Sequence, residues 1–230
     1  MDSSISNALK TVQENINEVL NKNQKTTRCT LVGVSKTKPV QLLQEAYDSG
    51  LRHFGENYVD EISEKAPQLP QDIKWHFIGH LQSNKIKQVL VPNLYIIETI
   101  DSIKLAEKVQ KICQNQNRNL KVLIQIKISD EESKYGIEPE NAYTLIEFII
   151  KNCPNLEFSG LMTIGKQGDV QAFQKLYNLR IDISNKFLLK EDNLELSMGM
   201  SADYQIAIQN GSTEVRIGST IFGQRDYSKQ

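Results

Sequence analysis

The sequence predicts an α/β fold: a closed (β/α)8 barrel of the TIM type with an extra helix at the N-terminus. Short apolar runs alternate with longer segments of helical periodicity, which is typical of a parallel sheet built from βαβ units. Eight such runs occur along the chain, the number of strands that closes a barrel of this type. No stretch rich in Gly, Pro or Ser divides the chain, so we expect a single domain over residues 1–230.

The hydrophobic periods define the predicted elements. Residues 1–28 should form a helix and its connection, because apolar side chains recur at spacings of three and four from Ile5 to Val19, and Ser3 or Ser4 is suited to cap the helix. The barrel should occupy residues 29–227; an open doubly wound sheet is the alternative, but usually has fewer strands. The predicted strands cover residues 30–34, 52–54, 75–78, 94–99, 121–128, 156–161, 194–196 and 214–217. The predicted helices between them cover residues 40–49, 102–113, 140–152, 170–189 and 202–210.

The composition is that of an ordinary globular protein and excludes several functional classes. Lys and Arg number 27 against 28 Asp and Glu, so the chain lacks the excess positive charge of a typical nucleic-acid-binding domain. The three cysteines form no CxxC pair, which argues against a disulfide framework or zinc site and favours a reducing compartment. There is no signal-peptide core and no apolar run near the ~20 residues that span a bilayer. We expect a cytoplasmic, monomeric protein that binds neither nucleic acid nor membrane.

Two loops at the predicted strand ends have the character of a phosphate site. Active sites of such barrels lie at the C-terminal ends of the strands, and the loops after the last two strands commonly bind phosphate. Here these loops contain Gly199-Met200-Ser201 and Gly218-Ser219. Small residues let backbone N–H groups approach an anion, and hydroxyls add donors. Glycine and serine also mark ordinary turns, but their presence in both loops favours phosphate.

Lys36 is the second candidate, because it directly follows the apolar run at residues 31–34. We expect its side chain to project into the mouth of the barrel. A desolvated lysine has a lowered pKa and becomes a nucleophilic amine, and the charge of neighbouring Lys38 would lower the pKa further. A lysine on a loop is usually only solvated. Beside a phosphate site, however, it indicates a phosphorylated aldehyde held as a Schiff base.

The strand ends also carry a specific set of motifs. They are Val34-Ser35-Lys36-Thr37-Lys38-Pro39, Phe54-Gly55-Glu56-Asn57-Tyr58, Trp75-His76-Phe77-Ile78-Gly79-His80-Leu81-Gln82-Ser83-Asn84-Lys85, Gly160-Leu161-Met162-Thr163-Ile164, Leu196-Ser197-Met198-Gly199-Met200-Ser201, Val215-Arg216-Ile217-Gly218-Ser219 and Ile221-Phe222-Gly223. With these motifs, which extend over residues 30–227, the sequence resembles the pyridoxal phosphate (PLP) homeostasis proteins. The barrel of that family is similar to the N-terminal domain of alanine racemase.

The resemblance implies PLP as the cofactor and assigns roles to individual residues. It implies Lys36 as the Schiff-base lysine and Arg216 near the pyridine nitrogen. It places Ser201, Gly218 and Ser219 at the phosphate, and Asn57, Met162 and Ser197 on the pocket wall. Two positions depart from the family: Ser219 stands where threonine is frequent, and Tyr135 stands where a smaller residue is common, which leaves the role of Lys134 unassigned.

Three functions fit a PLP-type barrel: a non-catalytic carrier, a small PLP enzyme such as a racemase, and a cofactor-free Schiff-base aldolase. PLP catalysis stores carbanion charge in a pyridinium ring, whereas the permanently charged Arg216 would keep the pyridine nitrogen unprotonated. Alanine racemase takes its second base from a C-terminal domain, and this chain ends twelve residues after Gly218, leaving only a loop tyrosine such as Tyr58 or Tyr135. An aldolase needs an acid/base beside the lysine, and the first two strand ends offer only Glu56.

We therefore expect a non-enzyme that holds PLP and releases it to apo PLP-dependent enzymes, acting in vitamin B6 and amino-acid homeostasis. No catalytic residue is assigned. No metal site is expected either: His76 and His80 are four residues apart, but they belong to a strand and its loop and no HExxH motif is present.

Overall fold

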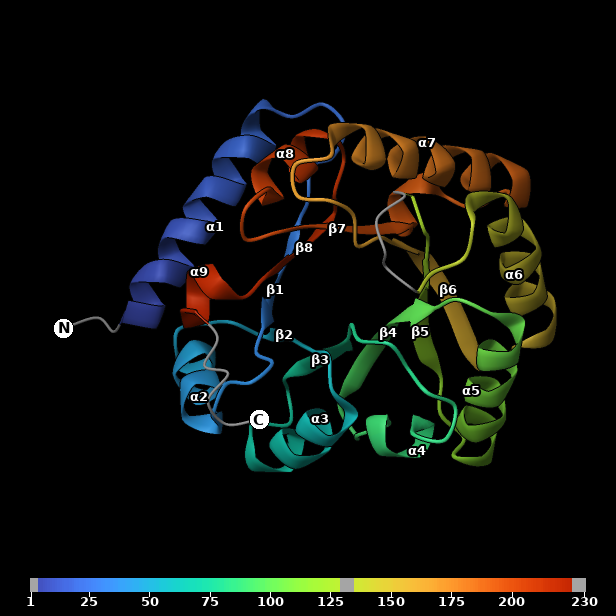
Figure 1. Cartoon of the computed structure of the whole chain (residues 1–230), viewed down its shortest axis with the longest axis horizontal. Helices are drawn as coiled ribbons and strands as arrows, with labels where there is room; N and C mark the ends of the chain where they lie inside the picture. The colour runs from blue at the N-terminus through green and yellow to red at the C-terminus, as the bar shows by residue number, and fades with distance from the viewer. Residues whose placement is uncertain (1–3, 129–134, 225–230) are drawn as a thin grey trace.

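Eight parallel strands close into a barrel, with β1 paired to β2 on one side and to β8 on the other (Figure 1). The computed structural model describes residues 4–128 and 135–224. The neighbours in the sheet follow the order of the chain, as expected for consecutive βα units. The strands are β1 (Thr30–Val34), β2 (His53–Glu56), β3 (Lys74–Phe77), β4 (Leu94–Ile100), β5 (Leu120–Gln125), β6 (Leu156–Met162), β7 (Glu195–Met200) and β8 (Glu214–Ile217).

The helices surround the barrel on its outer side (Figure 1). The first, α1 (Ser4–Lys22), packs across α2, α8 and α9, and its apolar stripe from Ile5 to Ile16 is buried there. This stripe is why the N-terminal segment is helical and why it docks on the barrel. The other helices are α2 (Val40–Asp48), α3 (Val59–Lys65), α4 (Ile86–Val89), α5 (Ile103–Asn115), α6 (Pro139–Asn152), α7 (Val170–Phe187), α8 (Tyr204–Gln209) and α9 (Ser219–Phe222). Short 3-10 turns cover Ala66–Gln68 and Glu191–Asn193.

The predicted barrel and its N-terminal helix are confirmed, and the differences are shifted element ends and three additional short helices. The fifth strand ends at Gln125 rather than at residue 128, because Ile126 turns to bridge Ile137. The short helices α3, α4 and α9 were not predicted, since four to seven residues are too few to show a clear helical period. Ser3 and the predicted barrel end at residue 227 lie outside the described residues.

The core has two parts of different character. Between strands and helices it is apolar, with Trp75, Phe54 and Phe77 among its largest fully buried side chains. Inside the barrel, where branched apolar side chains are usual, several ionisable or polar side chains are buried as well. They are His76, Glu98, Ser197, Glu214 and Arg216, alongside the small apolar cluster of Ile96, Leu123 and Met162. Buried charges need ion-pair or hydrogen-bond partners. In this barrel the hydrogen bonds among these side chains include Arg216, which lines the candidate site.

Among the helices of the described residues, none has the length and apolar character needed to cross a bilayer.

Candidate functional site

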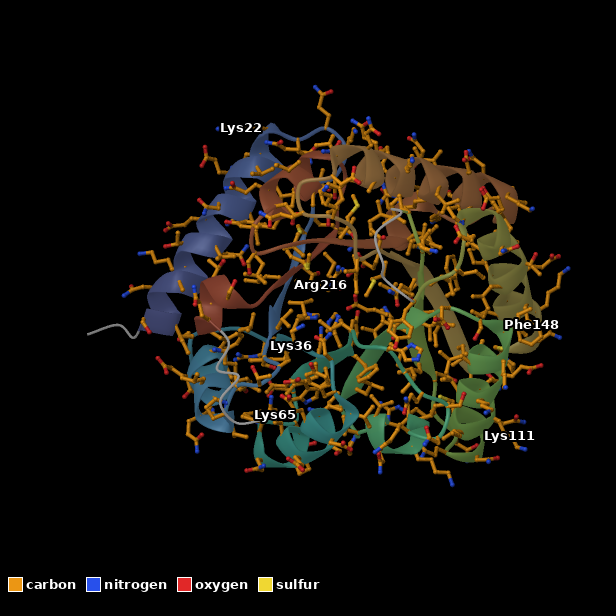
Figure 2. All side chains as sticks on the ribbon, viewed as in Figure 1. Lys22, Lys36, Lys65, Lys111, Phe148 and Arg216 are labelled. Carbon is orange, nitrogen blue, oxygen red and sulfur yellow. The ribbon has the colours of Figure 1, made fainter. Side chains whose placement is uncertain are left out.

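A pocket of about 410 Å³ opens at the C-terminal ends of the strands. Its wall combines three cationic side chains, Lys36, Lys38 and Arg216, with small residues of the loops after β7 and β8. Figure 2 shows Lys36 and Arg216 near the middle of the barrel in projection. The predicted site residues on the wall are Lys36, Asn57, Ser201, Arg216, Gly218 and Ser219. The structure therefore brings together six predicted residues from four separate parts of the sequence, which follow or belong to β1, β2, β7 and β8.

The loop after β7 has a glycine that the turn requires. Gly199 has a φ of +95°, and a Cβ atom there would lie 2.5 Å from the Cβ of Ala207. Asp203 holds the same loop by accepting the N–H of Met200 at 2.7 Å with one carboxylate oxygen and the N–H of Gly168 at 2.9 Å with the other. The loop that carries Ser201 is thus held by hydrogen bonds from backbone N–H groups to the Asp203 carboxylate.

The loops after β7 and β8 are joined at the pocket. The N–H of Gly218 donates to Ser201 Oγ at 3.2 Å. A Cβ atom at Gly218 would lie 3.2 Å from the carbonyl oxygen of Val34, so the backbone here passes close to β1. Ser219 begins α9 directly afterwards. Two hydroxyls and a glycine backbone therefore meet on one wall, which is the arrangement that suits a phosphate group.

Lys36 and Lys38 follow β1, and both line the pocket. Lys38 Nζ donates to the carbonyl oxygen of Gln224 at 2.6 Å, so its ammonium group is directed to the segment after α9. Asn57 follows the neighbouring strand β2, and a Cβ atom at Gly79, after β3, would lie 1.9 Å from the Asn57 carbonyl oxygen. Asn57 Oδ1 is buried and has no hydrogen-bond partner in the described chain.

Arg216 is held in place by a series of buried hydrogen bonds inside the barrel. Its guanidinium donates to Ser197 Oγ at 2.6 Å and to the carbonyl oxygen of Thr163 at 2.8 Å. Ser197 Oγ in turn donates to Glu98 Oε2 at 2.6 Å. Ser197 and Met162 were predicted on the pocket wall, but both are fully buried inside the barrel and are not among its lining residues. Ser197 therefore reaches the pocket only through Arg216.

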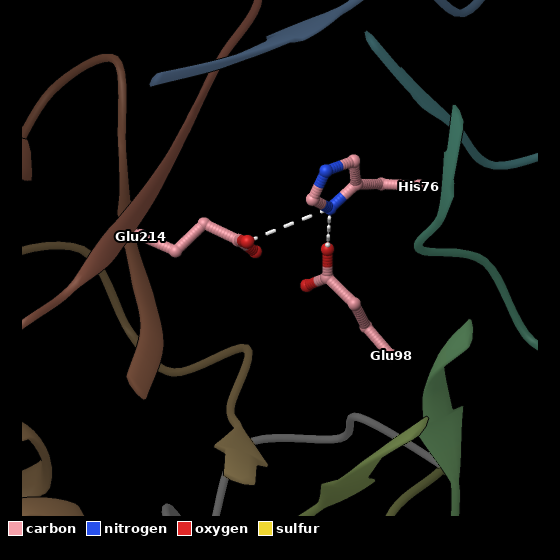
Figure 3. A group of neighbouring side chains, drawn as sticks. All are labelled: His76, Glu98 and Glu214. Atoms are coloured by element: carbon pink, nitrogen blue, oxygen red, sulfur yellow. Dashed lines mark hydrogen bonds and ion pairs between the residues drawn. The ribbon is translucent and has the colours of Figure 1, made fainter. Parts of the chain in front are cut away.

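Glu98 connects Arg216 to a cluster on β3, β4 and β8 (Figure 3). His76 Nδ1 lies 2.7 Å from Glu98 Oε1 and 3.5 Å from Glu214 Oε2, and His76 Nε2 lies 2.8 Å from His53 Nδ1. Burial and the adjacent Glu98 carboxylate raise the pKa of Glu214. Burial would raise the pKa of Glu98 too, but the hydrogen bond to His76 and the charges of His76 and Arg216 lower it. These shifts favour the ionised form of Glu98, which Ser197 links to Arg216, and the protonated form of Glu214.

The same cluster holds three candidate metal-ligating atoms within 4.8 Å of one another, one each from His76, Glu98 and Glu214. The hydrogen bonds among these residues and the nearby charge of Arg216 account for the arrangement without an ion. His80 takes no part in this cluster: its ring stacks on Tyr135 with centroids 3.7 Å apart. Lys134 lies outside the described residues.

Sequence reasoning missed both the polar barrel interior and part of the pocket wall. The signal for the interior was a glutamate in each of two strands, Glu98 within β4 and Glu214 at the start of β8. The additional wall residues lie at or after the ends of β1, β3, β6 and β7, and one follows α9. They are Val34, Lys38, Ile78, Ile164, Gln167, Met200, Ala202 and Gly223.

Comparison with known proteins agrees with this geometry. Residues 8–226 match the family model "Alanine racemase, N-terminal domain". A human pyridoxal phosphate homeostasis protein is 52% identical over an alignment of 214 residues that covers 87% of this chain and 78% of the human one. The chain belongs to the pyridoxal phosphate homeostasis protein family. A member from Caenorhabditis elegans is 41% identical and matches over 98% of both chains.

Solved structures of related barrels extend the comparison. PipY of Synechococcus elongatus, solved with PLP bound, is 30% identical and superposes with a TM-score of 0.81 over 95% of this chain and 100% of PipY. PipY without PLP gives a TM-score of 0.84 over the same shares. Alanine racemase of Clostridium difficile is 16% identical, with a TM-score of 0.70 over 96% of this chain and 61% of the racemase. That likeness shows the fold alone.

Proposed function

We propose that this protein binds PLP as a Schiff base on Lys36 and acts in intracellular PLP and amino-acid homeostasis without catalytic turnover. The observation that carries the proposal is the convergence of Lys36, Arg216 and the two serine loops on one pocket of about 410 Å³. The names of the relatives and the PLP-bound structure of PipY support it.

The residues present fit the cofactor. Ser201, Gly218 and Ser219 would hold the phosphate group, because they supply hydroxyls and backbone that an anion can approach. The unpartnered Asn57 Oδ1 beside the pocket fits a polar ligand that completes its hydrogen bonding. Lys36 supplies the amine that links reversibly to the aldehyde. Bound PLP would supply that aldehyde, which the pocket shields and later releases.

Arg216 favours a carrier over an enzyme. Its guanidinium is anchored to Ser197 and to the carbonyl oxygen of Thr163, and its charge is balanced by Glu98. An arginine cannot accept a proton from, or give one up to, a pyridine nitrogen. If it faces that nitrogen, the ring remains unprotonated and is a weak store for carbanion charge. The chain then holds the cofactor without activating it.

An absorbance spectrum tests the proposal directly. We expect the purified protein to take up PLP and turn yellow, with an imine band that disappears on borohydride reduction. Mass mapping of the reduced protein should place the adduct on Lys36. A colourless protein with no trapped adduct would refute PLP binding through a lysine, and would leave the cofactor-free aldolase to be tested.

The serines provide a second test. We expect Ser201→Ala and Ser219→Ala each to weaken PLP binding, while pyridoxal, which lacks the phosphate, should be affected far less. A hydrogen bond to a charged group contributes about 1.5–3 kcal/mol, so the loss should be about tenfold or more in affinity. Titrations of both ligands against both variants measure it. Equal losses for PLP and pyridoxal would show that these hydroxyls do not contact phosphate.

Catalysis can be measured by deuterium exchange. We expect no appreciable racemase or transaminase turnover with common amino acids, because Arg216 weakens the ring as an electron store. Incorporation of deuterium into L- and D-alanine in heavy water, followed by NMR, should stay near the rate given by free PLP. Exchange at enzymatic rates of about 1 per second or more would make the protein a small racemase.

The proposal also covers the domain organisation, oligomeric state and location of the protein, and the recipients of the cofactor. We propose that the chain acts as one domain over residues 1–230, as a monomer in the cytoplasm, and that apo PLP-dependent enzymes receive the cofactor. Transfer is tested by mixing the loaded protein with an apo-transaminase and following the gain of transaminase activity. A rate no different from that with an equal amount of free PLP would contradict directed delivery.

A further inference from the structure

The turn that carries Lys36 has a backbone conformation that needs support. Thr37, the residue after Lys36, has a φ of +62°. Positive φ is uncommon outside glycine and is a genuine outlier for a β-branched residue such as threonine. Such a conformation persists only where the surroundings hold it. The neighbours of Lys36 should therefore be bound by something other than the turn itself.

Two side chains of α3 hold both flanks of Lys36. The carboxylate of Glu61 accepts the N–H of Thr37 with both oxygens, at 3.1 and 2.8 Å. Lys65 Nζ donates to the carbonyl oxygen of Ser35 at 2.9 Å and to Glu61 Oε2 at 2.5 Å. Glu61 and Lys65 are four residues apart and so share one face of α3. The residues before and after Lys36 are thus tied to a single helix.

Glu56, the last residue of β2, completes this group. Its Oε1 atom accepts Ser35 Oγ at 2.6 Å and Lys65 Nζ at 2.8 Å, whereas its Oε2 atom is buried and has no hydrogen-bond partner among the residues that the structure describes. Lys65 therefore has three acceptors for its three protons: Glu56, Glu61 and the Ser35 carbonyl. Nearly all of the Lys65 side chain and all of the Glu56 side chain are shielded from water. Two carboxylates and one ammonium group are packed against the turn.

We propose that Glu56, Glu61 and Lys65 form a clamp that positions Lys36 for imine formation, and that the charge on Glu56 sets how firmly the clamp holds. This inference rests on the proposed function. None of the three residues lines the pocket, so they act as positioning residues through the backbone of Ser35 and Thr37. When Glu56 is ionised, the Lys65 ammonium is paired with two carboxylates, those of Glu56 and Glu61, instead of one, and the added attraction strengthens its hold on Glu56.

The clamp should respond to pH near neutrality. Burial raises the pKa of Glu56 to about 7, although Lys65 and the Ser35 hydroxyl oppose the shift and the charge of Glu61 adds to it. Glu56 is therefore mostly neutral below pH 7 and ionised above it. Both charged groups acting on it, Lys65 and Glu61, come from α3, and the Ser35 hydroxyl is at the end of β1. The turn should accordingly be held more firmly above pH 7.

The substitution Glu56→Gln tests the clamp, because it keeps the shape of the side chain and fixes it in a neutral state. The rate of imine formation with added PLP would be measured by stopped-flow absorbance from pH 5.5 to pH 9 in the cofactor-free protein. We expect the ratio of the wild-type rate to the variant rate to be near one below pH 6. Above pH 8 the ratio should rise to about tenfold. Dividing the two rates removes the pH dependence of the amine chemistry, which is common to both proteins.

Two further variants complete the test of the clamp, one at a second clamp residue and one at a control position. Glu61→Gln, on the partly exposed side of the clamp, should slow imine formation at every pH, because Thr37 loses its charged acceptor. Glu64→Gln is the matched control: it lies on the same helix but is exposed, and should leave the rate unchanged. A wild-type/Glu56→Gln ratio that is independent of pH would show a merely structural role and overturn the inference. Absence of any borohydride-trapped adduct in the wild type would instead refute the proposed function.

Discussion

Replacing Lys36 with alanine should abolish the covalent PLP adduct completely. Lys36 lies two residues after the end of β1 and lines the same pocket as Ser201 and Ser219. Without its amine the aldehyde has no partner at this position. The phosphate contacts remain, so PLP should still bind weakly and without the imine band. Absorbance spectra and mass spectra after borohydride reduction measure the loss.

Substitution of the neighbouring Lys38 is the control for the Lys36→Ala experiment. Lys38 lines the same pocket, but its ammonium group donates to the carbonyl oxygen of Gln224. We expect Lys38→Ala to keep the adduct on Lys36, and Lys87→Ala, an exposed position on α4, to behave as wild type. An adduct that survives in Lys36→Ala and disappears in Lys38→Ala would move the Schiff base to the second lysine.

The location of the pocket could be predicted from the sequence because it depends on topology. Alternating strand and helix patterns predict a barrel, and a barrel brings the ends of its strands to one face. Lys36 and the Gly218-Ser219 pair are separated by most of the chain, yet each could be assigned to that face from its place after an apolar run. The strand ends themselves were less certain, because the second and seventh runs are short.

The polar interior could not be predicted in the same way. Strand periodicity alone does not specify which side chains meet across a barrel, since this depends on register. Here the bulge between Ser197 and Met200 sets the pairing of β7 with β8. Ser197, Glu98 and Arg216 are therefore joined in a manner that no spacing in the sequence reveals. Sequence reasoning treated Arg216 only as a partner for the pyridine ring.

The clamp around Lys36 was hidden for a related reason. Glu56 was considered only as a general acid/base at a strand end, and α3 was too short to predict. Without that helix, nothing places Glu61 and Lys65 beside Ser35 and Thr37. The positive φ of Thr37 is likewise a consequence of its surroundings, because threonine does not favour that conformation.

Removing the charge of Arg216 should strongly destabilise the barrel, even without cofactor. Arg216 is almost completely buried, and its charge is balanced by Glu98 through Ser197. Arg216→Met removes the guanidinium charge that, together with His76, stabilises the buried Glu98 carboxylate, and loss of one partner of a buried charge pair costs about 3–5 kcal/mol. For a chain of this size we expect the midpoint of thermal unfolding to fall by roughly 6–20 °C. Lys151→Met, which removes one side of an exposed ion pair on α6, should leave the midpoint almost unchanged.

A double-mutant cycle separates the charge pair from simple loss of packing. Glu98→Gln removes the anion but keeps a side chain that can accept the Ser197 hydroxyl. If Arg216 and Glu98 stabilise one another, the double variant Arg216→Met/Glu98→Gln should be less destabilised than the sum of the two single variants by about 1–3 kcal/mol. Urea unfolding of all four cofactor-free proteins gives the free energies. Additive losses would show that Arg216 contributes by packing alone, and that the chain from Arg216 to His76 does not carry a balanced charge.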